Sequence, residues 1–235
     1  MSQDQLRYAL TVCAIYPEKV SVKTLLFCRF GGIHVIKHDR FGWACFIRIK
    51  GRRKFFNLKA WQVQSLINQY DYIDSYDGLE GARLDCVDGR HAVNALLTDV
   101  TFIDYLHAEE LYQGYMISQD EECIEKLAAI LYRNKKHIKK RLKLQLPEKL
   151  GTVLWFSWVK SEFSHYFPHF FKPISGEDLE EFDMREAINS QIRALSGGDV
   201  TKIDYVYHIS CWRALTELDA KAREVEDFER KYGSK

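Results

Sequence analysis

The sequence predicts an α+β protein that is mainly helical, with a helical body, a small antiparallel sheet near the N-terminus and a long C-terminal helix. Alternation of apolar and polar residues with period two is confined to the first quarter of the chain, and three-and-four spacing dominates its second half. Only 4 Pro and 13 Gly occur in 235 residues, so the elements should be joined by short loops. Because 46% of the residues are hydrophobic, a packed core is expected and disorder is not.

Two β-rich runs, Ile33–His38 and Trp43–Lys50, are separated by a short turn and predict a hairpin. Gly51 then turns the chain, and we expect Arg52–Phe56 to return as a third strand. Asn57 is a suitable N-cap for the helix expected next.

The stretch from Asp77 to Arg90 contains three glycines and four acidic residues among few large apolar ones. We therefore divide the chain into a mixed α+β segment over 1–76, a junction over 77–98 and a helical domain over 99–235.

Capping residues and helix-breaking residues predict where the helices of that domain begin and end. The expected helices are one capped by Asp99 or Thr101 and reaching Met116, one capped by Ser118 or Asp120, one from Pro147 to about Phe167, and one over 177–196. The third is apolar almost all round, which predicts a central place in the core or in an oligomer interface.

Gly197-Gly198 and Asp199 predict a helix stop followed by the cap of the last helix. That helix would have roughly thirty residues and span about 45 Å. Four acid-before-base pairs with four-residue spacing would support it if it projects from the body; packing along the domain is the alternative. The pairs are Glu217–Lys221, Asp219–Arg223, Glu226–Arg230 and Asp227–Lys231.

The net charge of +1 conceals blocks of alternating sign. Residues 1–59 hold 12 Lys or Arg against 3 acids, and residues 60–132 hold 3 against 14. Residues 133–172 then hold 10 against 2, and residues 173–235 hold 9 against 14. Such blocks either face each other within one fold or orient the protein on copies of itself or on a charged partner.

Nothing in the sequence points to an enzyme, a metal or a cofactor. The chain has no GxSxG elbow and no glycine-rich phosphate loop, and its six cysteines form no CxxC pair, so reduced thiols and the cytosol are expected. His34 and His38 would share one face of a strand between Cys28 and Cys45, but these spacings match no zinc site.

A basic run offers nucleic-acid binding as the alternative function. It carries seven Lys or Arg and no acid: Arg133, Lys135, Lys136, Lys139, Lys140, Arg141 and Lys143. The run has no aromatic residue for base stacking, and the acidic block 60–132 would repel phosphates, so a solvated or protein-docking face is favoured. A second basic cluster lies in the hairpin: Arg48, Lys50, Arg52, Arg53 and Lys54.

Several blocks in the helical half resemble a group of virion-morphogenesis proteins of Bacteroidetes phages and prophages. The resemblance covers about residues 99–230 and rests on these blocks: DVTF at 99–102 with Ala108-Glu109, ILYR at 130–133, FPHFF at 167–171, GGDVTK at 197–202, WRAL at 212–215 and LDAKARE at 218–224. It implies a tail assembly protein, such as a chaperone for the tape measure protein, or a small head-to-tail connector subunit. It implies no catalytic residues, and it does not extend to the first sixty residues.

The expected partners are therefore phage structural proteins, namely tape measure, tail tube or connector subunits, with homo-oligomers as a further expectation. Aromatic and Arg side chains commonly anchor such interfaces, and our candidates are Trp158, Trp212, Arg213, Leu215 and Arg223. Because the chain has neither a membrane-length apolar run nor the layout of a secretion signal, we expect no membrane contact. The expected location is the cytoplasm of the bacterial host during assembly, with the virion as a second location.

Overall fold

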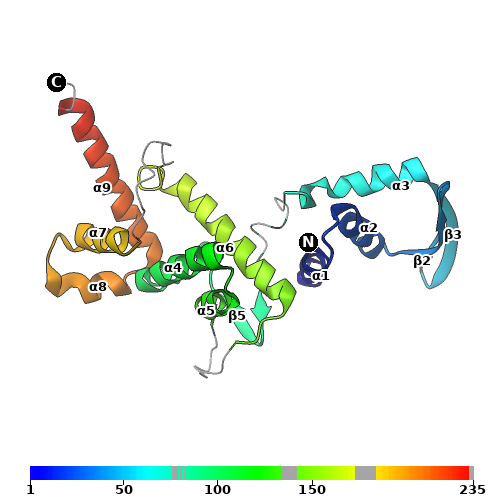
Figure 1. Cartoon of the computed structure of the whole chain (residues 1–235), viewed down its shortest axis with the longest axis horizontal. Helices are drawn as coiled ribbons and strands as arrows, with labels where there is room; N and C mark the ends of the chain where they lie inside the picture. Colours follow the sequence, from blue (N-terminus) through cyan, green and yellow to red (C-terminus); the bar gives the residue numbers. More distant parts are fainter. Residues whose placement is uncertain (76–78, 80, 82, 134–141, 173–183, 233–235) are drawn as a thin grey trace. The chain divides into compact units, whose positions relative to one another are not determined.

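The computed structural model confirms an α+β, mainly helical protein with a small N-terminal antiparallel sheet and a long C-terminal helix (Figure 1). It describes residues 1–75, 79, 81, 83–133, 142–172 and 184–232. Two compact units are present: unit 1 comprises 1–84 with 145–154, and unit 2 comprises 85–144 with 155–235. The division after residue 84 falls within the expected junction. Residues 145–154 nevertheless belong to unit 1, because the first turns of a helix there pack against the N-terminal helix.

Unit 1 begins with two helices, α1 (Gln3–Ile15) and α2 (Lys19–Phe30), in the part of the chain that the sequence analysis left only as mixed. Ser2 Oγ accepts a hydrogen bond from the Gln5 backbone N–H at 3.2 Å, and the Gln5 side chain accepts one from the Ser2 N–H at 2.8 Å. This reciprocal capping box fixes the start of α1.

The predicted hairpin and third strand are confirmed as an antiparallel sheet of β1 (Ile33–Asp39), β2 (Gly42–Ile49) and β3 (Arg52–Lys59) in the order β1-β2-β3. Lys50 and Gly51 have φ of 47° and 76°, so they form the tight turn with two positive φ values that suits the twist of a hairpin. Gly42 has a φ of 151°, and a Cβ there would lie 2.0 Å from the carbonyl oxygen of Leu58. Only glycine therefore fits at the start of β2.

A bulge in β1 overturns one expectation. His34 pairs with Phe46 and Val35 with Cys45, but the register then shifts so that Lys37 pairs with Ala44 and His38 with Trp43. Because paired residues project to the same side and alternate residues to opposite sides, His34 and His38 lie on opposite faces of the sheet. The prediction that they share a face was wrong.

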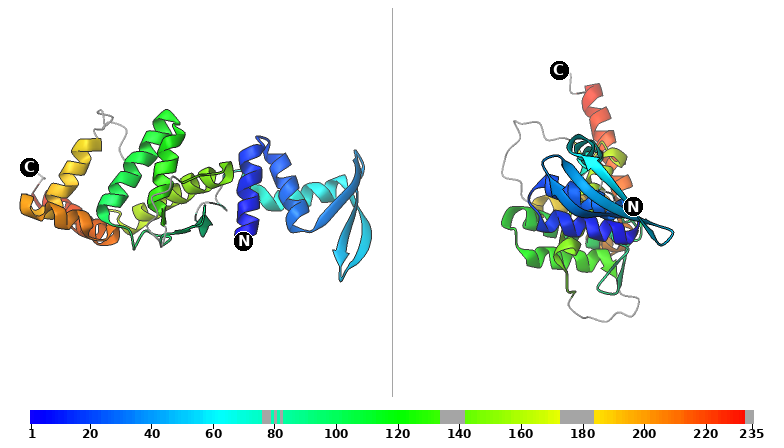
Figure 2. Two further views of the ribbon diagram at one scale, coloured as in Figure 1. Left: turned by 90° about the horizontal axis from the view of Figure 1, so that it is seen from below. Right: turned by 90° about the vertical axis from the view of Figure 1, so that its right-hand side faces the viewer.

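One face of the sheet packs against α2 and α3 (Figures 1 and 2). Phe27 of α2 and Val63 and Ile67 of α3 form a buried cluster against which Trp43 and Leu58 of the sheet pack. The helix α3 spans Ala60–Ile67 and continues as a 3-10 helix over Asn68–Ile73, so the prediction of Asn57 as its cap was wrong. Asn57 instead belongs to β3, which stays paired to β2 as far as Lys59.

Unit 2 contains a second, smaller sheet of β4 (Cys86–Val87), β5 (Arg90–Ala92) and β6 (Tyr132–Arg133). Asp88 and Gly89 connect the first two strands with φ of 46° and 73°. This hairpin lies inside the stretch that was expected to be only a junction.

Four helices match their predicted places, three in unit 2 and one, α6, that begins in unit 1 and continues into unit 2. They are α4 (Phe102–Ser118), α5 (Glu121–Leu131), α6 (Leu146–Tyr166) and α7 (Met184–Ser196). Thr101 caps α4 and Asp120 caps α5, both through their side-chain oxygens. Trp155, Phe156 and Phe163 of α6 are fully buried, in agreement with the expected central place of this helix. Residues 177–183 of the predicted fourth helix lie outside the described residues.

The long C-terminal helix is shorter than expected. Asp199 caps a 3-10 turn (Val200–Lys202), α8 follows over Ile203–His208, and a break then precedes α9 (Cys211–Tyr232), which has 22 residues. At this break the chain pairs with the segment before α4: the Phe102 N–H donates to the Ile209 carbonyl at 2.8 Å and the Cys211 N–H donates to the Val100 carbonyl at 2.8 Å. These backbone bonds replace the helical bonds that a continuous helix would need.

Candidate functional site

The N-terminal half of α9 is held in the core of unit 2. Cys211, Ala214, Leu215 and Leu218 are buried on one face of the helix. Trp212 packs in an aromatic cluster at the end of α6, where its ring lies 5.9 Å from Phe163, 5.2 Å from Tyr166 and 5.2 Å from Phe167, centroid to centroid. This half of α9 therefore anchors the helix.

Two acidic side chains fasten the middle of α9 to the chain that follows α6. The carboxylate of Asp219 accepts hydrogen bonds from the backbone N–H groups of His169 and Phe170, at 2.8 and 3.0 Å. Glu226 lies 2.8 Å from Nδ1 of His169 and 2.9 Å from Nζ of Lys172. Hydrogen bonds from Lys172 and then His169 lower the pKa of Glu226, and Glu226 raises the pKa of Lys172. These contacts orient α9 on its unit.

The acid–base pairs predicted along α9 behave differently from one another. Glu217 and Lys221 form the expected pair at 3.5 Å. Asp219 and Glu226 turn instead to the 169–172 segment, and Arg230 bonds to Asp227 at 2.7 Å, three residues back. Asp219 and Glu226 do not form their predicted pairs within the helix, because a contact with another segment of the fold holds the side chain in a more fixed geometry than an exposed pair does.

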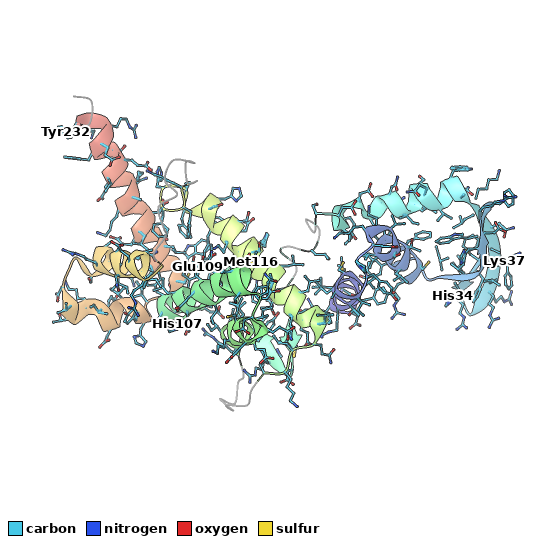
Figure 3. The ribbon with its side chains drawn as sticks, in the orientation of Figure 1. His34, Lys37, His107, Glu109, Met116 and Tyr232 are labelled. Atoms are coloured by element: carbon cyan, nitrogen blue, oxygen red, sulfur yellow. The ribbon has the colours of Figure 1, made fainter. Side chains whose placement is uncertain are left out.

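The apolar stripe of α9 continues into solvent beyond residue 222. Leu218 is 4% exposed, whereas Val225 is 57%, Phe228 is 64% and Tyr232 is 68% exposed. These three residues are spaced by three and four and thus share one face, and the rings of Phe228 and Tyr232 lie 4.8 Å apart. The end of α9 extends beyond the other helices of unit 2, and Tyr232 marks its last turn (Figures 1 and 3). We call Val225, Phe228 and Tyr232 the distal stripe.

Val225 and Tyr232 continue the three-and-four spacing of apolar residues along the sequence of this helix, but Phe228 was not predicted as part of that series. Its place three residues after Val225 and four before Tyr232 is the signal that could have found it. Asp219 and Glu226 were assigned to helical pairs, since their tertiary partners are fifty or more residues away.

The candidate protein-binding residues fall into two sets. Leu215 is fully buried and Trp212 is part of the aromatic cluster, so their side chains hold α9 onto its own unit. Arg213 and Arg223 are exposed on α9, and Trp158 is half-buried on α6. The structure therefore does not gather all five on one surface.

Most of the basic run proposed for nucleic acid lies outside the described residues, including Lys135, Lys136, Lys139, Lys140 and Arg141. Arg133 donates to the Asp99 carbonyl and to the Asp104 carboxylate, each at 3.1 Å. The backbone N–H of Lys143 donates to Asp88 at 3.2 Å. The two described ends of the run are thus both in contact with acidic residues of their own unit.

Titratable side chains also lie in and beside the core of unit 2. Glu109 of α4 forms an ion pair with Lys160 of α6 and accepts a hydrogen bond from Gln113 at 2.9 Å (Figure 3). Burial raises the pKa values of the Tyr105 hydroxyl and of the Cys211 thiol, which keeps both protonated at neutral pH. Within the described part of the chain, no group of three or more His, Cys, Asp or Glu is placed to hold a metal. No described helix has the length and apolar content needed to cross a bilayer.

Comparison of the chain with protein-family models, with curated proteins and with solved structures finds no match. The assignment of a function therefore rests on the residues and their geometry.

Proposed function

We propose that the chain is a non-enzymatic phage assembly protein that acts through contacts with other virion proteins in tail or head-to-tail assembly. The resemblance of residues 99–230 to virion-morphogenesis proteins motivates the biological setting. The observation that supports a binding role is the distal stripe, which exposes three large apolar side chains on a helix whose other half is anchored. Large aromatic side chains exposed together on one face are costly in water and are common in binding surfaces.

The partner best suited to the distal stripe is an amphipathic helix of another virion protein. Val225, Phe228 and Tyr232 follow the spacing by which one helix packs on another. Glu224, Glu229 and Arg230 are exposed beside them and could form the polar rim of such a contact. Anchoring of α9 by Asp219 and Glu226 lowers the entropy lost on binding, because the helix is already ordered.

A binding titration with identified candidates tests this proposal. The proteins encoded by the genes flanking that of this chain are purified singly and titrated against the full chain. We expect at least one to bind, and Phe228→Ala and Val225→Ala each to weaken that complex by tenfold or more, about 1.4 kcal/mol. Alanine keeps the helix intact, so loss of folding does not confuse the result.

Tyr205→Ala on α8 is the matched control, because Tyr205 is 63% exposed and lies in the same unit but outside the distal stripe. We expect this variant to bind like the wild type. The proposal fails if no flanking product binds, or if Tyr205→Ala weakens a complex as much as Phe228→Ala does.

The oligomeric state separates the two assembly roles. A monomer by light scattering at low and high salt supports a chaperone, whereas a ring-sized oligomer supports a connector subunit. Loss of that oligomer at high salt would show that attraction between the alternating charge blocks holds the subunits together.

The alternative function is a nucleic-acid-binding accessory protein that uses residues 133–143. The acidic contacts of Arg133 and of the Lys143 backbone give this site no support.

A further inference from the structure

The face of the β1–β2–β3 sheet opposite to α2 and α3, here called the outer face, combines basic and aromatic side chains. Strand register assigns its members. They are His34, Lys37 and Asp39 of β1, Ala44, Phe46 and Arg48 of β2, and Arg53, Phe55, Asn57 and Lys59 of β3. Trp43, Cys45 and Leu58 alternate with them and face the helices. The outer face is therefore not the side that the core uses.

An aromatic row crosses the centre of the outer face. His34 pairs with Phe46, and Phe46 pairs with Phe55. The His34 and Phe46 rings are stacked with centroids 4.6 Å apart, and the Phe46 and Phe55 centroids are 5.9 Å apart. Phe55 is 68% exposed, so its ring is open to a ligand at the end of the row.

Basic side chains flank this row on both sides. Arg48 pairs with Arg53 on the side of the Lys50–Gly51 turn, and the Arg53 guanidinium lies over the Phe46 ring at 5.2 Å from its centroid. Lys37 and Lys59 lie on the other side, where they line a shallow hollow of about 230 Å³ together with Asp39, Ala44 and Asn57. The small side chain of Ala44 leaves this hollow open between the two lysines.

The bulge in β1 is what brings His34 and Lys37 to the same face. In a regular strand, residues three apart project to opposite sides. The extra residue, Ile36, reverses the alternation and adds Lys37 to the basic flank. Bulges that re-aim a side chain in this way are frequent beside functional sites.

The charge of this region favours an anionic ligand. Residues 33–59 contain eight Lys or Arg and one acid, Asp39. The Asp39 carboxylate accepts hydrogen bonds from the backbone N–H groups of Phe41 and Gly42, at 2.8 and 3.2 Å, so it is engaged in the turn. The outer face itself thus presents four cations and one anion, Asp39, around an aromatic row.

We propose that the outer face binds single-stranded nucleic acid, with phosphates at Arg48, Arg53, Lys37 and Lys59 and an unpaired base stacked on Phe55. Basic grooves with exposed aromatic rings bind single strands in this way, since each base offers a ring face and each nucleotide a phosphate. A duplex would leave Phe55 without a base to stack on. This activity goes beyond the proposed protein-binding function, because it lies in unit 1 and uses none of the residues of α9.

Fluorescence anisotropy of the full chain with a labelled oligothymidylate of about twenty nucleotides tests the proposal. Four phosphate contacts predict that affinity falls roughly fifty-fold between about 50 and 200 mM salt. Phe55→Leu should weaken binding at least fivefold, because it keeps an apolar side chain and removes the ring. Trp61→Leu on α3, where the ring is 66% exposed, should leave binding unchanged.

Arg53 and Lys54 are a matched pair of basic residues for testing the contribution of charge on the outer face. They are neighbours on β3 and both exposed, but register places Arg53 on the outer face and Lys54, opposite Ile47, on the other. We expect Arg53→Gln to weaken binding several-fold more than Lys54→Gln. Equal effects of these two variants, or no binding at low salt, would overturn the proposal. Tighter binding of a duplex of the same length, unaffected by Phe55→Leu, would also overturn it.

Discussion

The carboxylate of Asp219 in α9 accepts a hydrogen bond from the backbone N–H of His169 at 2.8 Å, fifty residues away in the sequence. The same oxygen receives the N–H of Phe170, so one side chain satisfies two backbone donors just after α6. We expect Asp219→Ala to lower the free energy of unfolding by about 1–2 kcal/mol, measured by urea denaturation. Glu217→Ala removes an exposed helical pair and should cost less than about 0.5 kcal/mol. Equal losses in the two variants would contradict the anchoring role of Asp219.

Gly42 and Gly114 should respond oppositely to alanine. A Cβ at Gly42 would lie 2.0 Å from the Leu58 carbonyl oxygen, so Gly42→Ala must displace β3 and is expected to cost more than about 1 kcal/mol of stability. At Gly114, inside α4, the nearest atom to a Cβ is Cys123 Sγ at 3.5 Å, an ordinary contact. Gly114→Ala should therefore stabilise the protein by up to about 1 kcal/mol. Thermal unfolding, monitored by circular dichroism, shows whether each variant loses or gains stability.

Thiol labelling should follow burial. Cys86 is exposed, whereas Cys45 and Cys211 are buried, and burial raises the pKa of both buried thiols. Because the thiolate is the reactive form, we expect Cys86 to react first with a thiol reagent at neutral pH and Cys211 to react only on unfolding. Mass spectrometry of the labelled peptides measures the order in which the cysteines react. Early labelling of Cys211 would show that the N-terminal end of α9 opens readily.

Acid should weaken the contact of Glu226 with the 169–172 segment. Lys172 and His169 lower the pKa of Glu226 below its unfolded value, so the contact stabilises the folded state above that value and is lost as pH falls through the lowered pKa. The stability difference between wild type and Glu226→Gln should thus shrink from about pH 5.5 to about pH 3. Glu224→Gln, an exposed neighbour, is the control. A constant difference across this range would argue against a charged contact at Glu226.

The parts of the fold that could be predicted are those encoded by neighbours in the sequence. Alternation in Trp43–Lys50 and the Gly51 turn predicted the β2–β3 pairing. Capping residues predicted two helix starts with two candidates each, Asp99 or Thr101 and Ser118 or Asp120, of which Thr101 and Asp120 are the caps. The Asp88-Gly89 hairpin was overlooked, although this dipeptide is itself a hairpin signal.

The parts that could not be predicted depend on distant segments. The break before α9 arises from backbone hydrogen bonds between residues 100–102 and 209–211, and no local residue pattern predicts these bonds. The bulge at Ile36 likewise depends on pairing with β2, and without it His34 and Lys37 would have been assigned to opposite faces. For the same reason, periodicity identified the apolar stripe of α9 but not the position along the helix at which burial ends.

Hydrogen exchange of the backbone amides of α9, measured in the chain alone, shows whether the distal stripe is free for a partner. We expect strong protection near Leu215 and Leu218, declining to weak protection at the distal stripe, where Phe228 and Tyr232 are exposed. Uniformly strong protection to the end of the helix would contradict it, because the apolar face would then be covered within the protein itself and could not serve a partner.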